Sequence, residues 1–350
     1  MYTIIDYLNY YKDLTLEEAT FNKIDILLFS ILVYLPGESF NKEISLPEFY
    51  DYTYKYHKKD VGVMVPKAYE LLDIIKNSKR YKNLKIKNFV RIKDDTTQFG
   101  AATFILDDKK IVSFKGTDGS LIGWIENIRI AYKYLTVTQT LAVNYLKENI
   151  DINDKEVYVT GHSKGGNLAL VSSMELDDSL FNKITAIYNF DGPGLRLEEY
   201  NSSKYKRVLP KLNNIVPSMS CVGILLNNSN YEVVKSNLFA FEEHYPTSWN
   251  IFGQCFVLDE LSKSSLQLHE STTTGIKDLE NSKIEYTFET LFANLGKEYT
   301  KPVRVEMEDV KNILHNIKNI DKGVYTYIEA IISAMLSVSY KDSSSIKIED

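Results

Sequence analysis

Val157-Tyr-Val-Thr-Gly161-His-Ser163-Lys-Gly165-Gly166-Asn-Leu-Ala-Leu-Val171 is the stretch that decides the fold, because an apolar strand runs through G-x-S-x-G into an apolar helix. Its glycines carry no Cβ, so the strand and the helix can pack closely at the turn. The turn holds Ser163 in a strained backbone conformation that costs roughly 1–3 kcal/mol. Its hydroxyl would project from the C-terminal edge of a sheet, where N–H groups at the helix start face a developing anion. The stretch predicts a nucleophile that attacks a carbonyl carbon.

The sequence around this motif decides its interpretation, because G-x-S-x-G alone occurs by chance in many proteins. Residues 156–160 are rich in β-branched side chains, as expected of a buried strand. The residues after the motif form a helical apolar stripe, made of Leu168, Ala169, Val171, Ser172 and Leu176. A strand, a tight turn and a helix in this order form a nucleophile elbow, and this context favours the catalytic interpretation.

Composition limits the class of protein. The 350 residues are 44% hydrophobic and 12% aromatic, which is enough for one large domain or two smaller ones. The net charge of −6 argues against a general nucleic-acid binder, which needs a basic face. For the lysine-rich segment 79–87 we expect solvated surface, with contact to an anionic membrane as the alternative.

Cysteine usage and the start of the chain predict a cytoplasmic setting. Cys221 and Cys255 are the only cysteines, and the first residues lack the pattern of a secretory signal. The longest apolar runs, residues 24–35 and 328–338, are too short and too interrupted to span a bilayer, so we expect buried helices there.

Alternating elements predict an α/β fold with a mostly parallel sheet and helices on both faces. Helices are expected within residues 1–35 and over 66–76, 124–134 and 138–147. Residues 40–60 are expected to form a polar connection. Besides the strand of the elbow, strands are expected over 89–93, 100–106, 110–114 and 184–190, with a turn at Asp107-Asp108. Residues 208–216 are a weaker strand candidate because Pro210 interrupts them.

The C-terminal third is predicted to differ from the rest. We assign residues 1–260 to one α/β domain that includes the N-terminal helical segment. The serine and threonine cluster from Ser262 to Thr274 is predicted as a linker or loop. Residues 275–340 are predicted as a helical extension or cap, with helices over 284–295, 305–317 and 324–338. Residues 341–350 are predicted as a frayed tail.

A serine nucleophile needs a base, and the base follows it in proteins with this elbow, in the order serine, acid, histidine. This order excludes His57 and His162, and the side chain of His162 is expected to point away from its neighbour. His244 lies in a polar and aromatic loop after the last expected strand and is the preferred base. His269 and His315 are the alternatives.

The acid should orient that histidine and stabilise its charged form. Asp191 follows the strand after the elbow helix and should emerge at the same sheet edge as Ser163. The next expected strand offers only amides near its end, Asn213 and Asn214, and an amide cannot stabilise imidazolium by charge. Asp191 is therefore preferred, the alternatives being a group near Asn214 or a turn-capping role for Asp191.

An oxyanion hole needs donors on two loops. Residues 112–118 run from an apolar strand through Gly116 to Thr117, whose N–H and hydroxyl could both donate. The backbone N–H of Lys164 would supply the other donor. A single donor of this type typically contributes about 2.7–4 kcal/mol to the barrier reduction.

These residues resemble a known family. Phe114-Lys-Gly-Thr117, Gly123-Trp124 with Asn127, and Gly161-His-Ser-Lys-Gly-Gly-Asn-Leu-Ala169 are similar to class-three, fungal-type lipases. The sequence resembles still more the bacterial Mbeg-like α/β-hydrolases. Further matches lie within residues 1–257, namely Phe21-Asn22 with Asp25, Asn189-Phe-Asp-Gly-Pro-Gly194, Val216-Pro217, Val222-Gly223, and His244 with Ser248-Trp249.

The resemblance implies an α/β-hydrolase fold with Ser163 as nucleophile, His244 as base and Thr117 at the oxyanion hole. Two positions depart from the lipases: Lys164 replaces an apolar residue, and Asn214 falls near the position of their acid. We expect a cytoplasmic serine esterase or lipase-like hydrolase that acts on a small-molecule or lipid ester without metal or organic cofactor. A catalytically silent scaffold and an acyltransferase are the alternatives.

Overall fold

The computed structural model describes residues 1–57, 62–118, 120–277, 285–286 and 289. An eight-stranded sheet forms the centre, and its strands lie across it in sequence order. They are β1 (Ile44–Ser45), β2 (Lys85–Lys93), β3 (Gln98–Leu106), β4 (Lys109–Phe114), β5 (Glu156–His162), β6 (Ile184–Phe190), β7 (Leu212–Pro217) and β8 (Tyr231–Val234). A separate two-stranded ribbon consists of β9 (Ile251–Phe252) and β10 (Cys255–Phe256).

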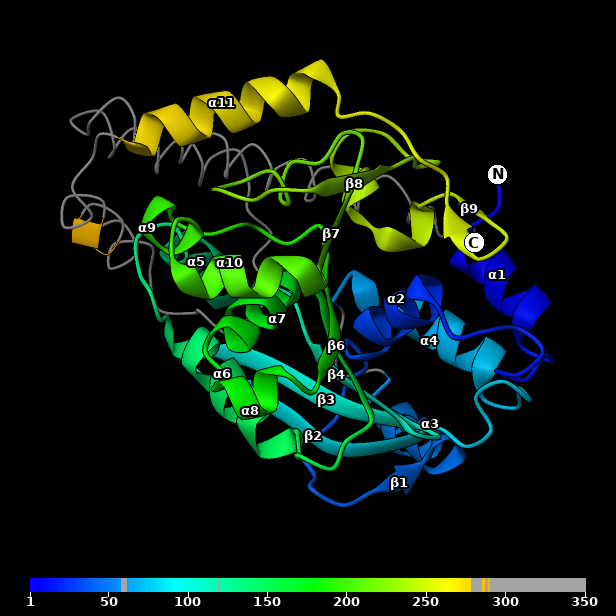
Figure 1. Cartoon of the computed structure of the whole chain (residues 1–350). Coiled ribbons are helices and arrows are strands. Elements are labelled where there is room, and N and C mark those ends of the chain that lie inside the picture. Colours follow the sequence, from blue (N-terminus) through cyan, green and yellow to red (C-terminus); the bar gives the residue numbers. More distant parts are fainter. Residues whose placement is uncertain (58–61, 119, 278–284, 287–288, 290–350) are drawn as a thin grey trace, which may run out of the picture.

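Helices cover both faces of the sheet (Figure 1). One face packs against α1 (Ile4–Tyr11), α2 (Lys23–Leu32), α3 (Leu46–Tyr54) and α4 (Met64–Ile75). The other packs against α6 (Val137–Asn149), α7 (Lys164–Met174), α8 (Asp178–Phe181) and α10 (Ser203–Val208). The remaining helical segments are α5 (Leu121–Arg129), α9 (Leu197–Tyr200), α11 (Lys263–Lys277) and the 3₁₀ turns η1 (Leu209–Lys211), η2 (Ala240–His244) and η3 (Pro246–Ser248).

Side-chain alternation along the strands supplies both hydrophobic layers. On β3, Ala102 and Phe104 join the cluster that includes α1, α2 and α4, whereas Phe99 and Ala101 join the cluster of α6 and α7. Successive side chains of a strand point to opposite faces, so each strand contributes to both layers. The nearly continuous burial of β3 follows from this two-sided packing.

The strand directions place the carboxyl ends of the central strands at one edge. Strands β1 to β4 pair antiparallel, and β4 to β8 pair parallel. The register sets Phe114 opposite Gly161, and it also pairs Phe190 with Ile215. The predicted fold class is confirmed: this is an α/β-hydrolase fold with a mostly parallel sheet, and the segment after β5 leads into α7 at the shared edge.

The N-terminal region contains more structure than the sequence predicted. Residues 40–60, expected as a connection, contain β1 and α3. The sequence did contain a signal for α3, because Ser45 and Glu48 form a capping box at its start. Within residues 1–35 the helical prediction holds for α1 and α2, which are separated by turns. The predicted helix 124–134 ends at Arg129.

Residues 208–216 divide between two kinds of structure. The prediction of strand there is wrong for residues 208–211, where Pro210 lies in the 3₁₀ turn η1. Strand β7 begins directly afterwards, at Leu212. The predicted turn between β3 and β4 is confirmed, with Asp107 at a φ of 55°.

The predicted loop at Ser262 to Thr274 is wrong, because α11 covers residues 263–277. Ser262 accepts a hydrogen bond from the Ser265 N–H at 3.1 Å, as a helix N-cap does. Ser265 and Thr272 are buried, and the imidazole Nδ1 of His269 lies 2.6 Å from the Ile224 carbonyl oxygen. These tertiary contacts stabilise a helix that serine and threonine alone disfavour.

The predicted helices 284–295, 305–317 and 324–338 and the predicted tail 341–350 lie outside the described residues, apart from residues 285–286 and 289. None of the helices in the described ranges combines the length and apolar character that crossing a bilayer requires.

Candidate active site

Ser163 occupies a strained turn between β5 and α7. Its φ of 58° and ψ of −133° are unusual for a residue with a Cβ. Two backbone hydrogen bonds hold the turn: the Ser163 N–H donates to the Phe190 carbonyl at 2.9 Å, and the Ser163 carbonyl accepts from the Gly166 N–H at 2.8 Å. The surrounding strands and helix therefore enforce this conformation, as the sequence predicted for a nucleophile elbow.

Two glycines allow the helix to approach the sheet this closely. A Cβ at Gly161 would lie 2.2 Å from the Gly165 backbone, and a Cβ at Gly165 would lie 2.1 Å from the Phe114 carbonyl oxygen. Real Cβ atoms do not come so close to backbone atoms. Only glycine fits at these positions, and the close packing fixes the distance between Ser163 and the end of β4.

Asp191 and His244 are in direct contact. Asp191 Oδ2 lies 2.6 Å from His244 Nδ1, and the aspartate is fully buried directly after β6. Its other oxygen, Oδ1, accepts hydrogen bonds from the Ser220 hydroxyl and, at 3.0 Å, from the Gly223 N–H. Both oxygens are thus held in place, and the carboxylate fixes the orientation of the imidazole.

The imidazole of His244 is packed between aromatic rings. It is 7% exposed, like Ser163, and its ring centroid lies 4.5 Å from that of His162 and 5.5 Å from that of Phe241. With Nδ1–H donating to Asp191, Nε2 is the acceptor nitrogen of the neutral ring. That is the tautomer that a general base requires.

His162 has a role that the sequence did not indicate. Its Nε2 lies 2.8 Å from the His244 carbonyl oxygen, and its Nδ1 lies 3.1 Å from the Tyr34 hydroxyl. Burial, together with the nearby His244, lowers the pKa of His162 well below its usual value. The neutral ring donates from Nε2–H and accepts at Nδ1, so neither nitrogen is free to act as a base. Its ring packs against that of His244.

Thr117 lies on the loop after β4, next to the nucleophile. Its hydroxyl accepts a hydrogen bond from Asn127 Nδ2 of α5 at 2.9 Å, which leaves the hydroxyl proton able to donate elsewhere. A Cβ at the preceding Gly116 would lie only 3.2 Å from the Ser163 Cβ. Lys164 is the first residue of α7, where backbone N–H groups have no acceptor within the helix.

The alternative residues are occupied elsewhere. The Asn214 amide donates to Asn228 Oδ1 at 2.7 Å and to the Ser229 carbonyl at 2.6 Å. His269 contacts the Ile224 carbonyl from α11. His315 lies outside the described residues. Of the two residues considered as the partner of His244, Asp191 contacts its imidazole, whereas the Asn214 side chain is hydrogen-bonded to other groups.

Sequence reasoning missed Tyr34, Gln98 and Glu126. Tyr34 follows α2 and its hydroxyl reaches His162, and Gln98 and Glu126 surround the Lys164 side chain. Each lies at least 37 positions from Ser163, and a tyrosine, a glutamine or a glutamate at that separation has no local pattern to reveal it.

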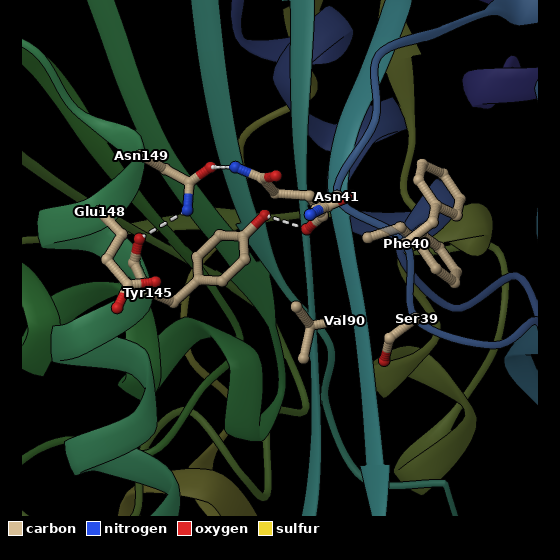
Figure 2. Close-up of a pocket in the computed structure, with 9 residues that line it drawn as sticks. Ser39, Phe40, Asn41, Val90, Tyr145, Glu148 and Asn149 are labelled. Carbon is tan, nitrogen blue, oxygen red and sulfur yellow. Dashed lines mark hydrogen bonds between the residues drawn. The ribbon is translucent and has the colours of Figure 1, made fainter.

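A pocket on the antiparallel half of the sheet lies between β2 and the C-terminal end of α6 (Figure 2). Its volume is about 410 Å³. Three polar residues of its wall bond to one another: Tyr145 Oη donates to the Asn88 carbonyl at 2.6 Å, and the Asn88 amide donates to Asn149 Oδ1 at 2.6 Å. These groups need no ligand, and β3 and β4 lie between β2 and β5, the strand that leads to Ser163, so we assign this pocket no part in the site.

Comparison with known proteins identifies the family. The model of the Mbeg1-like family matches residues 75–293, which include Ser163, Asp191 and His244. The chain belongs to the Mbeg1-like family. No curated protein sequence matches it significantly.

Two solved lipase structures resemble this Mbeg1-like protein. The M37 lipase is 14% identical with a TM-score of 0.39, and the match covers 72% of this chain and 80% of the lipase. The Rhizomucor miehei lipase in its propeptide complex is 13% identical with a TM-score of 0.36, and the match covers 69% and 74% of the two chains.

Proposed function

We propose that this Mbeg1-like protein is a serine hydrolase of the esterase or lipase type that cleaves an acyl or lipid ester through an acyl-serine intermediate. The observation that supports this most is the 2.6 Å contact between Asp191 and the His244 imidazole, whose ring packs against that of His162, the residue before the strained Ser163. A strained serine, an oriented imidazole and a buried carboxylate are the three parts of a nucleophilic triad.

In the first half of the proposed reaction, His244 Nε2 takes the proton of the Ser163 hydroxyl as Oγ attacks the ester carbonyl carbon. The tetrahedral intermediate carries its negative charge on the former carbonyl oxygen. Asp191 stabilises the imidazolium that forms and is not itself protonated. The imidazolium then donates its proton to the alkoxide leaving group, the C–O bond breaks, and the alcohol departs.

In the second half, water replaces the alcohol. His244 takes a proton from water, the hydroxide attacks the acyl carbon, and collapse of the second intermediate breaks the bond to Ser163 Oγ. The imidazolium returns its proton to Oγ and the carboxylic acid is released. Each step uses side chains of the chain and a water molecule.

The oxyanion is held in this proposal by Thr117 and Lys164. The backbone N–H of each and the Thr117 hydroxyl are the donors, and the Asn127 amide fixes the direction of that hydroxyl. Loss of one such donor typically costs 10²–10³-fold in kcat. The positive end of α7 adds to the stabilisation.

The proposed substrate is a small-molecule or lipid ester in the cytoplasm. An apolar acyl group is supported by the Phe241 ring, which lies beside the imidazole of the proposed base His244. Peripheral contact with a membrane is part of the proposal for a lipid substrate, since a lipid ester would be met at a bilayer surface.

Intact-protein mass after treatment with an alkyl fluorophosphonate tests the proposal. We expect one adduct per wild-type chain and none on Ser163→Ala or His244→Ala. Asn214→Ala is the matched control and should be labelled at the wild-type rate, because Asn214 bonds to Asn228 and Ser229.

Two other results of these measurements would indicate a different class of function. A folded wild type that stays unlabelled, with and without detergent, would exclude a serine hydrolase and favour a scaffold that retains the fold. Labelling together with transfer of the acyl group to an added alcohol in preference to water would instead favour an acyltransferase.

A further inference from the structure

The Lys164 side chain is a buried charge beside the nucleophile. Its side chain is 0% exposed, and its ammonium donates to three acceptors: Glu126 Oε2 at 2.7 Å, the Gln98 carbonyl at 2.6 Å and Gln98 Oε1 at 2.8 Å. The Glu126 side chain is 3% exposed. All three ammonium protons are thus used inside the protein.

Stability is a weak reason for such a pair. The free energy needed to remove two charges from water is often larger than the free energy gained from their attraction. Apolar side chains of similar size therefore often stabilise the fold equally well. Burial accordingly raises the pKa of Glu126, although the Lys164 ammonium opposes this effect. An ion pair at this position therefore calls for an explanation in terms of what it positions.

Gln98 connects the ammonium to the oxyanion loop. While its Oε1 accepts from Lys164, its Nε2 donates to the Gly116 carbonyl at 3.3 Å. The carbonyl belongs to the peptide that joins Gly116 to Thr117. In a trans peptide the C=O and N–H groups point in opposite directions. Holding the carbonyl toward Gln98 therefore sets the direction of the Thr117 N–H.

Glu126 connects the same ammonium to α5. This helix also holds Asn127, whose amide donates to the Thr117 hydroxyl at 2.9 Å. Glu126 Oε2 accepts a second hydrogen bond from the Gln98 N–H at 3.2 Å, which fixes α5 to the start of β3. The packing is close, because a Cβ at Gly123 of α5 would lie 2.6 Å from the Thr117 Cγ2.

We propose that the buried Lys164–Glu126 pair, together with Gln98, positions the oxyanion hole: the Lys164 side chain orients the Thr117 donors, and its backbone N–H is itself the other donor. One residue would thereby tie both halves of the hole to the nucleophile elbow. This inference rests on the proposed hydrolase function. Lys164, Gln98 and Glu126 are positioning residues whose side chains act on the reaction through Thr117.

The principal variant removes both charges at once, as Lys164→Met with Glu126→Met, so that neither charge is left buried alone. A misplaced oxyanion donor should lower kcat/KM for a p-nitrophenyl ester about 100-fold with KM little changed. The inhibition constant of a trifluoromethyl ketone, which forms a tetrahedral adduct with an active serine, should rise by a similar factor. A purely structural role would not make these two quantities change together.

Gln98→Met is the second variant, and it leaves both charges in place while it removes the hydrogen bond to the Gly116 carbonyl. We expect kcat/KM to fall and the inhibition constant to rise in this variant too. It therefore tests the positioning role if the double variant does not fold. The matched control replaces another buried pair, as Asp25→Leu with Arg80→Met, and should leave kcat/KM unchanged. That pair lies at the N-terminal end of α2, whereas Tyr34, which contacts the site, follows the C-terminal end of that helix.

The outcomes separate the two proposals. A wild type that is labelled by fluorophosphonate, with folded Lys164 and Gln98 variants that keep the wild-type kcat/KM and inhibition constant, overturns the positioning inference alone. A folded wild type that is neither labelled nor active on esters overturns the hydrolase proposal and this inference with it.

Discussion

Two buried ion pairs, Asp25–Arg80 and Lys164–Glu126, have similar chemistry and different surroundings. Each has N–O contacts of 2.6–2.7 Å, and each is almost completely excluded from solvent. Asp25 also accepts hydrogen bonds from the Tyr7 and Tyr81 hydroxyls, so its contacts tie α1 and α2 to the segment before β2. The first pair joins parts of the N-terminal fold. The second reaches groups that adjoin Ser163.

The comparison shows that burial of a charge does not by itself indicate function. What distinguishes the pairs is the next group along each hydrogen-bond chain. Arg80 continues to the carbonyls of Ala19 and Thr20, which belong to the segment between α1 and α2. Lys164 continues through Gln98 to the Gly116 carbonyl, beside the nucleophile. We therefore expect changes at the first pair to alter stability and changes around the second to alter catalysis.

The largest expected effect tests whether the surroundings of Lys164 are catalytic at all. Asp191→Asn keeps the shape of the side chain but presents an amide to His244 Nδ1, which favours the wrong imidazole tautomer. We expect kcat to fall about 10⁴-fold. Steady-state ester hydrolysis measures it, with Asn214→Ala as the control that should stay near wild type. If both variants retain full turnover, Asp191 is not the acid.

The next effect concerns the other pair. Asp25→Ala leaves Arg80 buried without its carboxylate, and this should lower the free energy of unfolding by about 3–5 kcal/mol. Urea denaturation followed by circular dichroism measures it, and kcat of the folded fraction should not change. Glu18→Ala removes an exposed ion pair with Lys79 and should have no measurable effect. A large loss of kcat in Asp25→Ala would contradict the separation of the two regions.

A third change disturbs the oxyanion loop without touching any charge. A Cβ at Gly116 would lie 2.1 Å from Tyr34 Oη and 2.6 Å from the His162 carbonyl oxygen. The loop must shift in Gly116→Ala, and a displacement of about 1 Å should lower kcat about 100-fold. Gly253→Asn, in the open turn of the β9–β10 ribbon, is the control. Wild-type turnover in Gly116→Ala would show that the loop position is not critical.

The smallest effect is a pH dependence of stability. His162 is buried and neutral, and its pKa is lowered well below the usual 6.5. Below pH 6.5 the unfolded chain therefore binds a proton at this residue that the folded chain does not bind. The contribution of His162 to the free energy of unfolding is complete above pH 6.5. It is lost as the pH falls below that value, at up to about 1.4 kcal/mol per pH unit. His162→Gln should reduce the pH dependence of the free energy of unfolding by one proton. Equal slopes in wild type and His162→Gln would show that His162 is protonated in the folded chain.

Much of the fold could be predicted because its signals are local. The alternation of strands and helices, the elbow glycines and the turn at Asp107 each depend on residues within a few positions of one another. The helix α3 was missed although its capping box is present at Ser45. The helix α11 was missed because serine and threonine favour turns unless tertiary contacts outweigh that preference.

The candidate site was predictable as far as strand order dictates it. Parallel strands bring their carboxyl ends to one edge, so Asp191 was expected near Ser163, and its bond to His244 spans 53 positions in the order expected of acid and base. The resemblance to a lipase-related family pointed to Thr117 and His244 through short motifs. The family match over residues 75–293 agrees with that resemblance.

The sequence by itself determined the α/β architecture, the strained serine between β5 and α7, and the set of residues able to assist it, because period, glycine placement and strand order act over short distances. Only the tertiary structure decided which groups surround them: that Tyr34 bonds to His162, that the His162 ring packs against His244, and that Lys164 is paired with Glu126 and Gln98. A charge or a hydroxyl in a sequence has many partners of similar energy. The packing of distant segments selects one of them by bringing it within hydrogen-bond distance and excluding water from the rest.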